Sequence, residues 1–225
     1  MTVVAAYDAY ADWYEDYVSG RAAPYTRRSG DLLADLLGPG EGTCLDLCCG
    51  TGVRAETLRE LGWTPLGVDL SRGQLRHAAA RMPVAVGDAA ALPVATGSLP
   101  AVACALAHTD LPDYAAVLRE VARVLRPGGR FVHIGVHPCF VGAFANWSDR
   151  PRVLVDERYA DRSYTTDAWD PSGVRARVGA WHVPLADLLN AVTAAGLRLV
   201  HAAEAGPGGV ADVLGLLALK PAPPA

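Results

Sequence analysis

From residue 43 to residue 136 the sequence alternates short apolar runs with amphipathic segments, and this alternation strongly constrains the fold. The run 99–107 is almost wholly apolar, as expected of a strand that is covered on both faces. The segments between the runs have helical length, roughly ten to fifteen residues. Strands and helices that alternate in this way form βαβ units, so we expect a parallel sheet with helices on both faces.

The remaining sequence completes this sheet. The strands expected first are 43–48, 65–68, 84–86, 99–107 and 130–136, and the helices among and after them are 51–61, 71–81, 113–125 and 184–195. Two last strands, 197–203 and 210–219, have a connection too short for a parallel pair and must be antiparallel. We therefore predict a Rossmann-like, doubly wound α/β fold, with a seven-stranded, mostly parallel sheet and an antiparallel C-terminal hairpin strand.

Composition excludes several classes of protein. The 225 residues carry 20 basic and 24 acidic side chains, and a net charge of −4 argues against a dedicated nucleic-acid binder. No run approaches the ~18 apolar residues of a membrane span, and the N-terminus lacks a signal-peptide pattern. Five cysteines without a C-x-x-C pair indicate reduced thiols and no metal site. We expect a cytoplasmic protein that binds neither nucleic acid nor membrane.

Residues 45–52, Leu-Asp-Leu-Cys-Cys-Gly-Thr-Gly, carry the first chemical signal. A strand runs into a glycine-containing turn and then into a helix N-terminus, where a ligand can approach the backbone and an anionic group is favoured. Residues 50–55 fit the dinucleotide pattern G-x-G-x-x-A, and Asp69 lies nineteen residues after Gly50, where an acid binds ribose. An NAD-dependent oxidoreductase is therefore one possible interpretation.

Three further features favour another cofactor. Asp46 lies near the end of the first strand, where a carboxylate repels a pyrophosphate but attracts an ammonium or a sulfonium group. Asp88 follows the third strand, in position to accept a hydrogen bond from an adenine amine. Residues 123–131 form a tight helix-to-strand turn.

These residues resemble the class I S-adenosylmethionine-dependent methyltransferases, in the small-molecule branch related to quinone-biosynthesis methyltransferases. Residues 45–52 match the first motif of that family, 67–71 the ribose-binding strand end, 87–89 the adenine-side motif and 118–131 the late helix-turn-strand signature. Cys48 departs from the pattern, because the family loop has glycine there. We expect the loop to form with a slightly different backbone.

The resemblance implies S-adenosylmethionine as cofactor. Asp46 and the backbone of residues 48–50 are expected to face its methionine part, Asp69 its ribose, and Leu70, Asp88 and Ala89 its adenine. The alternative roles are helix capping or loop solvation for Asp69 and Asp88, and a buried acid bonded to backbone amides for Asp46. The full expected set is Tyr14, Asp46, Cys48, Cys49, Gly50, Asp69, Leu70, Asp88, Ala89 and Ala107.

Tyrosines form a helical stripe in the N-terminal segment, which is acidic elsewhere. Tyr7, Tyr10, Tyr14 and Tyr17 recur at spacings of three, four and three. They either pack on the sheet or belong to a lid over the cofactor. In the resembling family an N-terminal helix often covers the methionine end, which points to Tyr14.

Three histidines are candidate catalytic bases, because an acceptor that arrives protonated must lose a proton. His108 ends the fourth strand, His137 follows the fifth, and His182 opens the helix after the variable segment. The alternative for each is a positioning or packing role. The spacing of His133 and His137 looks metal-like but lacks a third ligand.

The chain divides into an N-terminal helical lid (1–40), a cofactor-binding core (41–137), a variable acceptor-side insertion (138–183) and a C-terminal helix and strands that complete the sheet (184–220). Aromatic residues of the insertion are expected to line the acceptor pocket or to form a small core: Phe140, Phe144, Trp147, Tyr159, Tyr164 and Trp169. We predict methyl transfer to a small hydrophobic or aromatic metabolite, with an oxygen, nitrogen or carbon acceptor. The alternatives are a cyclase or isomerase with the methyltransferase fold, and an NAD-dependent oxidoreductase.

Overall fold

The computed structural model describes residues 5–149, 152–168 and 171–222, and its main sheet has seven strands. Their order is β10-β11-β5-β4-β1-β2-β3. The strands are β1 (Thr43–Leu47), β2 (Thr64–Asp69), β3 (Val84–Val86), β4 (Leu99–Ala105), β5 (Leu125–Val136), β10 (Arg198–Ala205) and β11 (Val213–Leu219). Strands β1 to β5 pair in parallel, and β11 runs antiparallel to both of its neighbours. The predicted fold class is confirmed.

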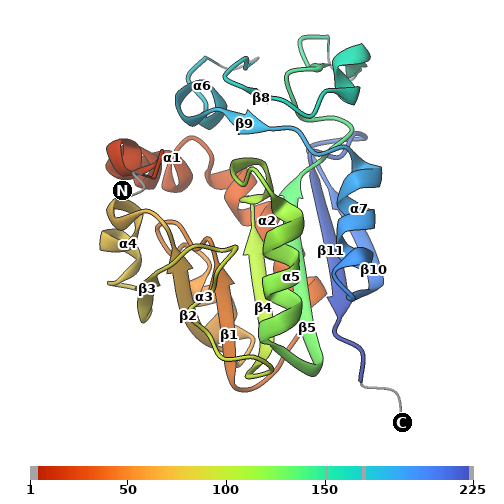
Figure 1. Ribbon diagram of the computed structural model, residues 1–225. Helices are drawn as coiled ribbons and strands as arrows, with labels where there is room; N and C mark the ends of the chain where they lie inside the picture. The colour runs from red at the N-terminus through yellow and green to blue at the C-terminus, as the bar shows by residue number, and fades with distance from the viewer. Residues whose placement is uncertain (1–4, 150–151, 169–170, 223–225) are drawn as a thin grey trace.

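Helices cover both faces of this sheet (Figure 1). On one face α5 (Tyr114–Val124) and α7 (Leu185–Ala194) pack against the sheet in the largest apolar cluster. On the other face α2 (Ala23–Leu37) and α3 (Ala55–Glu60) bury leucines against β1, β4 and β5. Helix α4 (Arg72–Ala78) packs beside β2 and β3. The carboxyl ends of the parallel strands therefore form the one edge at which a crevice for a ligand is expected.

Local sequence explains where these elements begin and end. Helix α5 buries residues 114, 117, 118, 121 and 124, at helical spacing, and Asp113 caps it by accepting a hydrogen bond from Ala116 N at 2.8 Å. Strand β4 ends two residues earlier than expected, because Leu106 has a φ of 62°, which breaks the extended backbone. Helix α3 begins four residues later than expected, after turns that include Gly52, with a φ of 78°.

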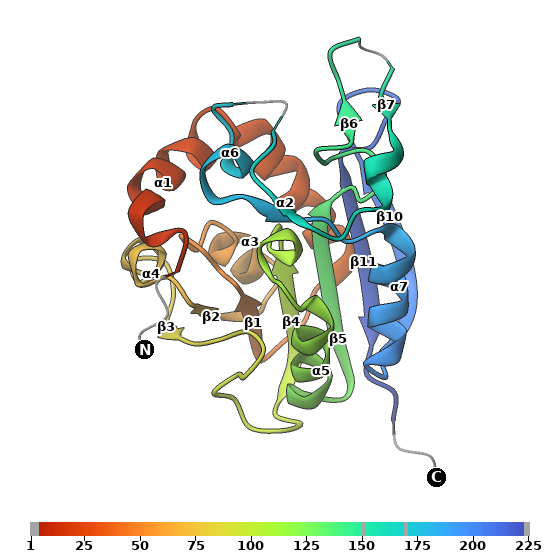
Figure 2. The same ribbon diagram turned by 45° about the horizontal axis from the view of Figure 1, so that its top comes forward.

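Above the carboxyl ends of the strands lie the N-terminal elements and the insertion (Figures 1 and 2). A 3-10 turn, η1 (Asp8–Tyr10), precedes α1 (Ala11–Ser19). The insertion, for which the sequence shows no clear period, forms short elements: β6 (Ala145–Asn146), β7 (Leu154–Val155), η3 (Glu157–Ala160), β8 (Tyr164–Thr165), α6 (Val174–Val178) and β9 (Ala180–Trp181). Helix α6 lies beside α1, where the Arg177 guanidinium carbon is 4.0 Å from the centre of the Trp13 ring.

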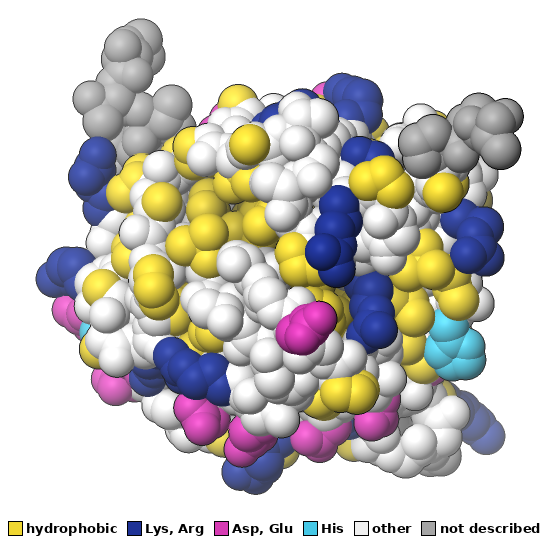
Figure 3. All heavy atoms as spheres, turned by 90° about the horizontal axis from the view of Figure 1, so that it is seen from below, with side chains coloured by type: hydrophobic (Ala, Val, Ile, Leu, Met, Phe, Trp, Pro, Cys, Tyr) yellow, Lys and Arg dark blue, Asp and Glu magenta, His cyan; other side chains and the backbone are white. Residues whose placement is uncertain are grey.

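The surface at the edge of the sheet opposite the N-terminal elements and the insertion carries both charged and apolar side chains. Figure 3 shows this surface from below: acidic and basic side chains are interspersed along its lower rim, and apolar side chains gather in a hollow. Among the residues that the structure describes, no helix is both long and apolar enough to cross a membrane, and no three His, Cys, Asp or Glu side chains are grouped to hold a metal ion.

Candidate active site

The loop between β1 and α3 begins the site. Its backbone has positive φ at Cys48 (57°), Gly50 (55°) and Gly52 (78°). Cys48 thus takes the left-handed conformation that favours glycine, which costs a residue with a side chain about 1–2 kcal/mol. Gly52 has little room for a side chain, because a Cβ there would lie 3.1 Å from Ala78. The loop forms as expected, with backbone strain at the one position where cysteine replaces glycine.

Asp69 fastens this loop to the end of β2. Its Oδ2 accepts a hydrogen bond from Gly50 N and its Oδ1 accepts one from Ser71 N, both at 2.8 Å. Burial raises the pKa of Asp69, and the backbone N–H groups partly oppose that rise because they favour the ionised carboxylate. A carboxylate is therefore held rigidly at the strand end.

A cavity of about 230 Å³ opens between this loop and the ends of β2 and β4. The expected cofactor-binding residues that line it are Tyr14, Cys48, Gly50, Asp69, Leu70, Asp88, Ala89 and Ala107. Asp46 and Cys49 are buried, at 1% and 6% exposure, and are not among the lining residues. The structure therefore brings most of the expected set to one cavity.

Buried polar atoms without a hydrogen-bond partner indicate which kind of ligand this region can bind. Asp46 Oδ2 and Gln74 Oε1 are buried without a hydrogen-bond partner among the described residues. Gln74 lines the cavity, and a Cβ on Gly50 would lie 3.7 Å from its Oε1 and 3.9 Å from Tyr14 Cε1. Burial raises the pKa of Asp46 to about 7, against the opposing effect of Arg54. The free Gln74 oxygen in the cavity lining suits a ligand with an ammonium group and hydroxyl groups, so this lining fits S-adenosylmethionine.

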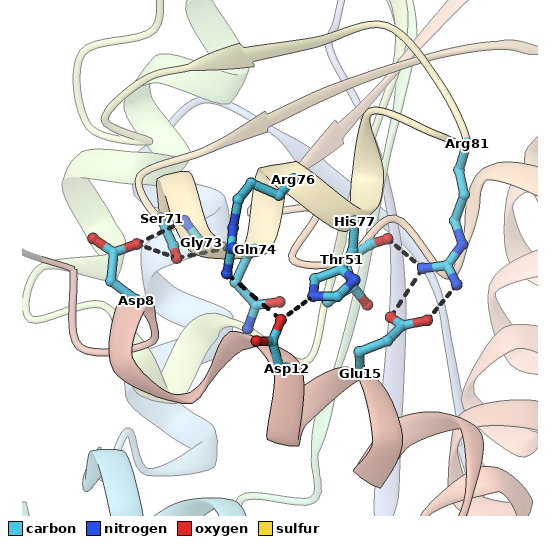
Figure 4. A network of polar contacts seen from close by, with 10 residues as sticks. All are labelled: Asp8, Asp12, Glu15, Thr51, Ser71, Gly73, Gln74, Arg76, His77 and Arg81. Atoms are coloured by element: carbon cyan, nitrogen blue, oxygen red, sulfur yellow. Dashed lines mark hydrogen bonds and ion pairs between the residues drawn. The ribbon is translucent and has the colours of Figure 1, made fainter.

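Acidic side chains hold the N-terminal segment against α4 and the loop before α3 (Figure 4). The contacts join Asp8 to Ser71 and Gly73, Asp12 to Arg76 and His77, Glu15 to Arg81, and Arg81 to the Thr51 carbonyl. The first three involve acids at helical spacing, and Asp8 Oδ1 accepts from Ser71 Oγ at 2.7 Å. This α1–α4 contact places η1 and α1 at the rim of the cavity. The acidic character of this segment is evident from the sequence, but the partners of these side chains are not.

A second cavity, of about 680 Å³, adjoins the first. Tyr7, Tyr14, Leu106, Asp110 and Gly179 line both. Its other aromatic lining residues are Tyr17, Tyr25 and Trp147. Its size is typical of a small-molecule site, and the two cavities together have the arrangement that a bimolecular transfer needs.

Tyrosines of the predicted stripe lie in different places. Tyr7, Tyr14 and Tyr17 line the larger cavity, and the rings of Tyr7 and Tyr14 meet edge to face with centroids 5.3 Å apart. Tyr10 is 36% exposed and is not a lining residue. Tyr25, which the sequence analysis did not single out, lines the larger cavity with a buried hydroxyl that has no partner among the described residues.

Asp110 is the titratable residue at the junction that sequence analysis missed. It is accessible from the cavities, and its Oδ2 accepts a hydrogen bond from the Tyr7 hydroxyl at 3.1 Å. The surrounding protein nevertheless removes enough water to raise the pKa of Asp110 to about 7. Its place just past the end of β4, two residues after His108, was the signal available in the sequence.

The three candidate histidines have other surroundings, and none lines either cavity. His108 is buried beside His133, and burial lowers its pKa far below the ordinary value. His137 Nε2 lies 2.7 Å from a carboxylate oxygen of Glu204. His182 Nε2 lies 2.9 Å from the Tyr159 carbonyl, to which it donates. Their catalytic roles stay predictions.

Aromatic residues of the insertion divide between two roles. Trp147 lines the larger cavity and Tyr164 the smaller one. Phe140, Phe144 and Tyr159 belong to a small apolar cluster of the insertion, which Trp147 shares. Trp169 lies outside the described residues.

Comparisons with known proteins agree with this geometry. Residues 44–129 match the family model described as a methyltransferase domain. A demethylmenaquinone methyltransferase of Mycolicibacterium paratuberculosis is 42% identical over 97 residues, which are 43% of this chain and 42% of that protein. The match thus spans less than half of that relative's length.

Solved structures extend the likeness to nearly the whole fold. An S-adenosylmethionine dependent methyltransferase from Mesorhizobium loti has a TM-score of 0.69 at 24% identity, over 87% of this chain and 97% of that one. These comparisons support a class I S-adenosylmethionine-dependent methyltransferase: residues 44–129 match the methyltransferase domain, and the fold is that of such enzymes. The resemblance predicted from the motifs is confirmed. The same fold also occurs in a [4+2]-cyclase, with a TM-score of 0.62 at 20% identity over 87% of this chain and 82% of that one.

Proposed function

We propose that this methyltransferase domain transfers a methyl group from S-adenosylmethionine to a small hydrophobic or aromatic acceptor. The observation that carries the proposal is the pair of adjoining cavities, one lined by the motif residues and the other by aromatic side chains. The demethylmenaquinone methyltransferases among its relatives favour a quinone-like acceptor. The division into lid, core, insertion and C-terminal segment is part of this proposal.

The residues of the smaller cavity would hold the cofactor. Asp69 would accept hydrogen bonds from the ribose hydroxyls while it keeps its own bonds to Gly50 and Ser71. Asp88 and Ala89 would contact the adenine, and Tyr14 the methionine end. Bound there, S-adenosylmethionine would supply a methyl group on a positively charged sulfur, which is a good leaving group.

The protein's main contribution would be alignment. Methyl transfer needs the acceptor atom in line with the methyl–sulfur bond, and orientation of two reactants can contribute roughly 7–11 kcal/mol. Tyr7, Tyr14 and Leu106 line both cavities and would bring the two ligands into contact. Leu106 does so from a left-handed backbone conformation, with a φ of 62°, a kind of strain that clusters at functional sites.

Calorimetric titration with S-adenosylmethionine, S-adenosylhomocysteine and NADH tests the cofactor. We expect the two adenosyl compounds to bind with micromolar affinity and NADH to be silent, and binding of NADH alone would contradict the proposal. Incubation with a panel of hydroxylated aromatic compounds, followed by mass spectrometry, then tests the reaction. A product heavier by one methylene group supports methyl transfer. A product of unchanged mass supports the cyclase or isomerase alternative, which the fold also accommodates.

A further inference from the structure

We propose that Asp110 is the proton acceptor of the reaction and that the acceptor atom is the oxygen of a phenolic hydroxyl group, so that the product is an aryl methyl ether. This inference rests on the proposed methyl transfer and narrows it to one residue and one kind of nucleophile.

Position is the first reason. Asp110 lines both cavities, so its carboxyl group lies where the two ligands would meet. The Tyr7 hydroxyl donates to Oδ2 at 3.1 Å and orients the carboxyl group. No hydrogen bond to Oδ1 is found among the described residues, which leaves this oxygen for a ligand. A base must lie within hydrogen-bond reach of the proton it removes.

Charge around the larger cavity favours an acidic acceptor over an amine. Arg28 and Asp212 both line the cavity and form an ion pair at 2.6 Å, so their charges balance. Arg175 also lines the cavity, where burial lowers its pKa and Asp110 is the acid that opposes this effect. A cationic amine next to Arg175 would be repelled, whereas an oxygen that gains negative charge would be stabilised.

The remaining lining suits an aromatic ring. Tyr17, Tyr25 and Trp147 line the part of the larger cavity that the smaller one does not share. Aromatic side chains pack favourably against another ring, either edge to face or stacked with an offset. A ring among these side chains can direct a hydroxyl group toward Asp110, at the junction.

The proposed step balances without a further reactant. The hydroxyl oxygen forms the new bond to the methyl carbon, the carbon–sulfur bond breaks with its electron pair going to sulfur, and the hydroxyl proton goes to Asp110. The sulfonium becomes a neutral thioether, and Asp110 returns its proton to water after the product leaves.

Several titratable groups face Asp110. Tyr7 and Tyr14 approach it from the N-terminal elements, Asp69 from the end of β2 and Arg175 from α6. Burial raises the pKa values of both tyrosines, which keeps them protonated, while Asp69 opposes and Arg175 favours ionisation of Asp110. Desolvation thus raises the pKa of Asp110 toward neutral pH, the range in which a general base works best.

Binding of 2-naphthol tests the contact without turnover. The protein is saturated with S-adenosylhomocysteine, and the dissociation constant of 2-naphthol is measured by its fluorescence from pH 5.5 to pH 8. We expect affinity to rise about tenfold across this range, because an ionised carboxylate accepts the hydroxyl hydrogen bond more strongly. The Asp110→Asn variant should show a flat profile, and the matched variant Asp35→Asn, at an exposed acid that lines neither cavity, should keep the rise. An unchanged profile in Asp110→Asn overturns the assignment.

Methyl transfer to two phenols of different acidity tests the proton transfer. With 2-naphthol, which is protonated at pH 7, Asp110→Asn should lower kcat/KM by about 10²-fold or more. With the more acidic 4-nitrophenol, much of which is already ionised, the loss should be at least tenfold smaller. A merely structural role predicts equal losses for both.

The outcomes separate this inference from the proposed function. Failure of the wild-type protein to bind S-adenosylhomocysteine refutes both. Cofactor binding with methylation of amines or carbon atoms only, or of neither phenol, refutes the phenolic acceptor and leaves the proposed cofactor site standing. Equal losses with the two phenols refute Asp110 as the base.

Discussion

Replacement of the buried Asp46 by asparagine should make the free protein more stable while it weakens cofactor binding. Asp46 is 1% exposed, and one of its carboxyl oxygens has no partner among the described residues. Burial raises its pKa from 3.8 to about 7, although Arg54 opposes the rise. In the unfolded chain this carboxyl group ionises near pH 4, whereas in the folded protein it stays protonated up to about pH 7.

The size of the expected change in the free energy of unfolding follows from the two pKa values of Asp46. A rise from 3.8 to about 7 corresponds to about 4 kcal/mol, at about 1.4 kcal/mol for each tenfold change in proton affinity. Because the folded state binds the proton more tightly, Asp46 stabilises the fold least above pH 7, and stability is lost as the pH rises from about 4 to about 7. The asparagine variant has no such loss. An unpartnered amide costs about 1–3 kcal/mol, so we expect a net gain of roughly 1–3 kcal/mol at pH 8.

Urea unfolding of Asp46→Asn and wild type from pH 5 to pH 8 measures this effect. The free-energy difference between them should move in favour of the variant by about 3 kcal/mol over that range. The exposed Asp35→Asn change is the matched control and should show no such trend. Calorimetry should find weaker S-adenosylhomocysteine binding by Asp46→Asn. A stability difference that does not depend on pH would refute the argument that burial has raised this pKa.

Three further changes test other parts of the site. Asp69→Ala should weaken S-adenosylhomocysteine binding by about 10- to 100-fold in calorimetry, since hydrogen bonds to a charged group contribute about 1.5–3 kcal/mol, and unchanged affinity would refute the placement of the cofactor. Glu15→Gln should speed amide hydrogen exchange in α1 by about fivefold through loss of its ion pair, whereas the exposed Asp16→Asn should not, and equal rates would contradict the α1–α4 contact. Burial lowers the pKa of His133 to about 3, so the stability that the neutral ring contributes is present above pH 6.5 and is lost as the pH falls. Between pH 7 and pH 4.5 the free energy of unfolding of His133→Gln, measured in urea, should therefore fall by about 3 kcal/mol less than that of the wild type. Parallel curves for the two proteins would contradict this.

Some of the site could be predicted from the sequence because it lies within single motifs. Asp69 follows an apolar strand, and Gly50 and Gly52 follow another, so short-range pattern alone placed them at neighbouring strand ends. The seven-stranded sheet followed from the alternation of strands and helices and from one short connection. The differences between the predicted and observed elements were local. At Leu106, for example, the left-handed backbone ends β4 earlier than predicted, and hydrophobic periodicity carries no signal for such a residue.

The rest depended on contacts between segments far apart in the chain. Tyr7 and Asp110 are 103 residues apart in sequence, and their hydrogen bond exists only because η1 folds over the end of β4. The histidines were prominent as residue types, but the burial of His108 and the contact of His137 with Glu204 depend on the fold, and neither can be read from spacing. The sequence by itself determined the sheet and the glycine-containing loop after β1, because periodicity and turn chemistry are local. The tertiary structure alone decided which charged groups share the cavity junction, because electrostatics depends on distance and solvent access rather than on order along the chain.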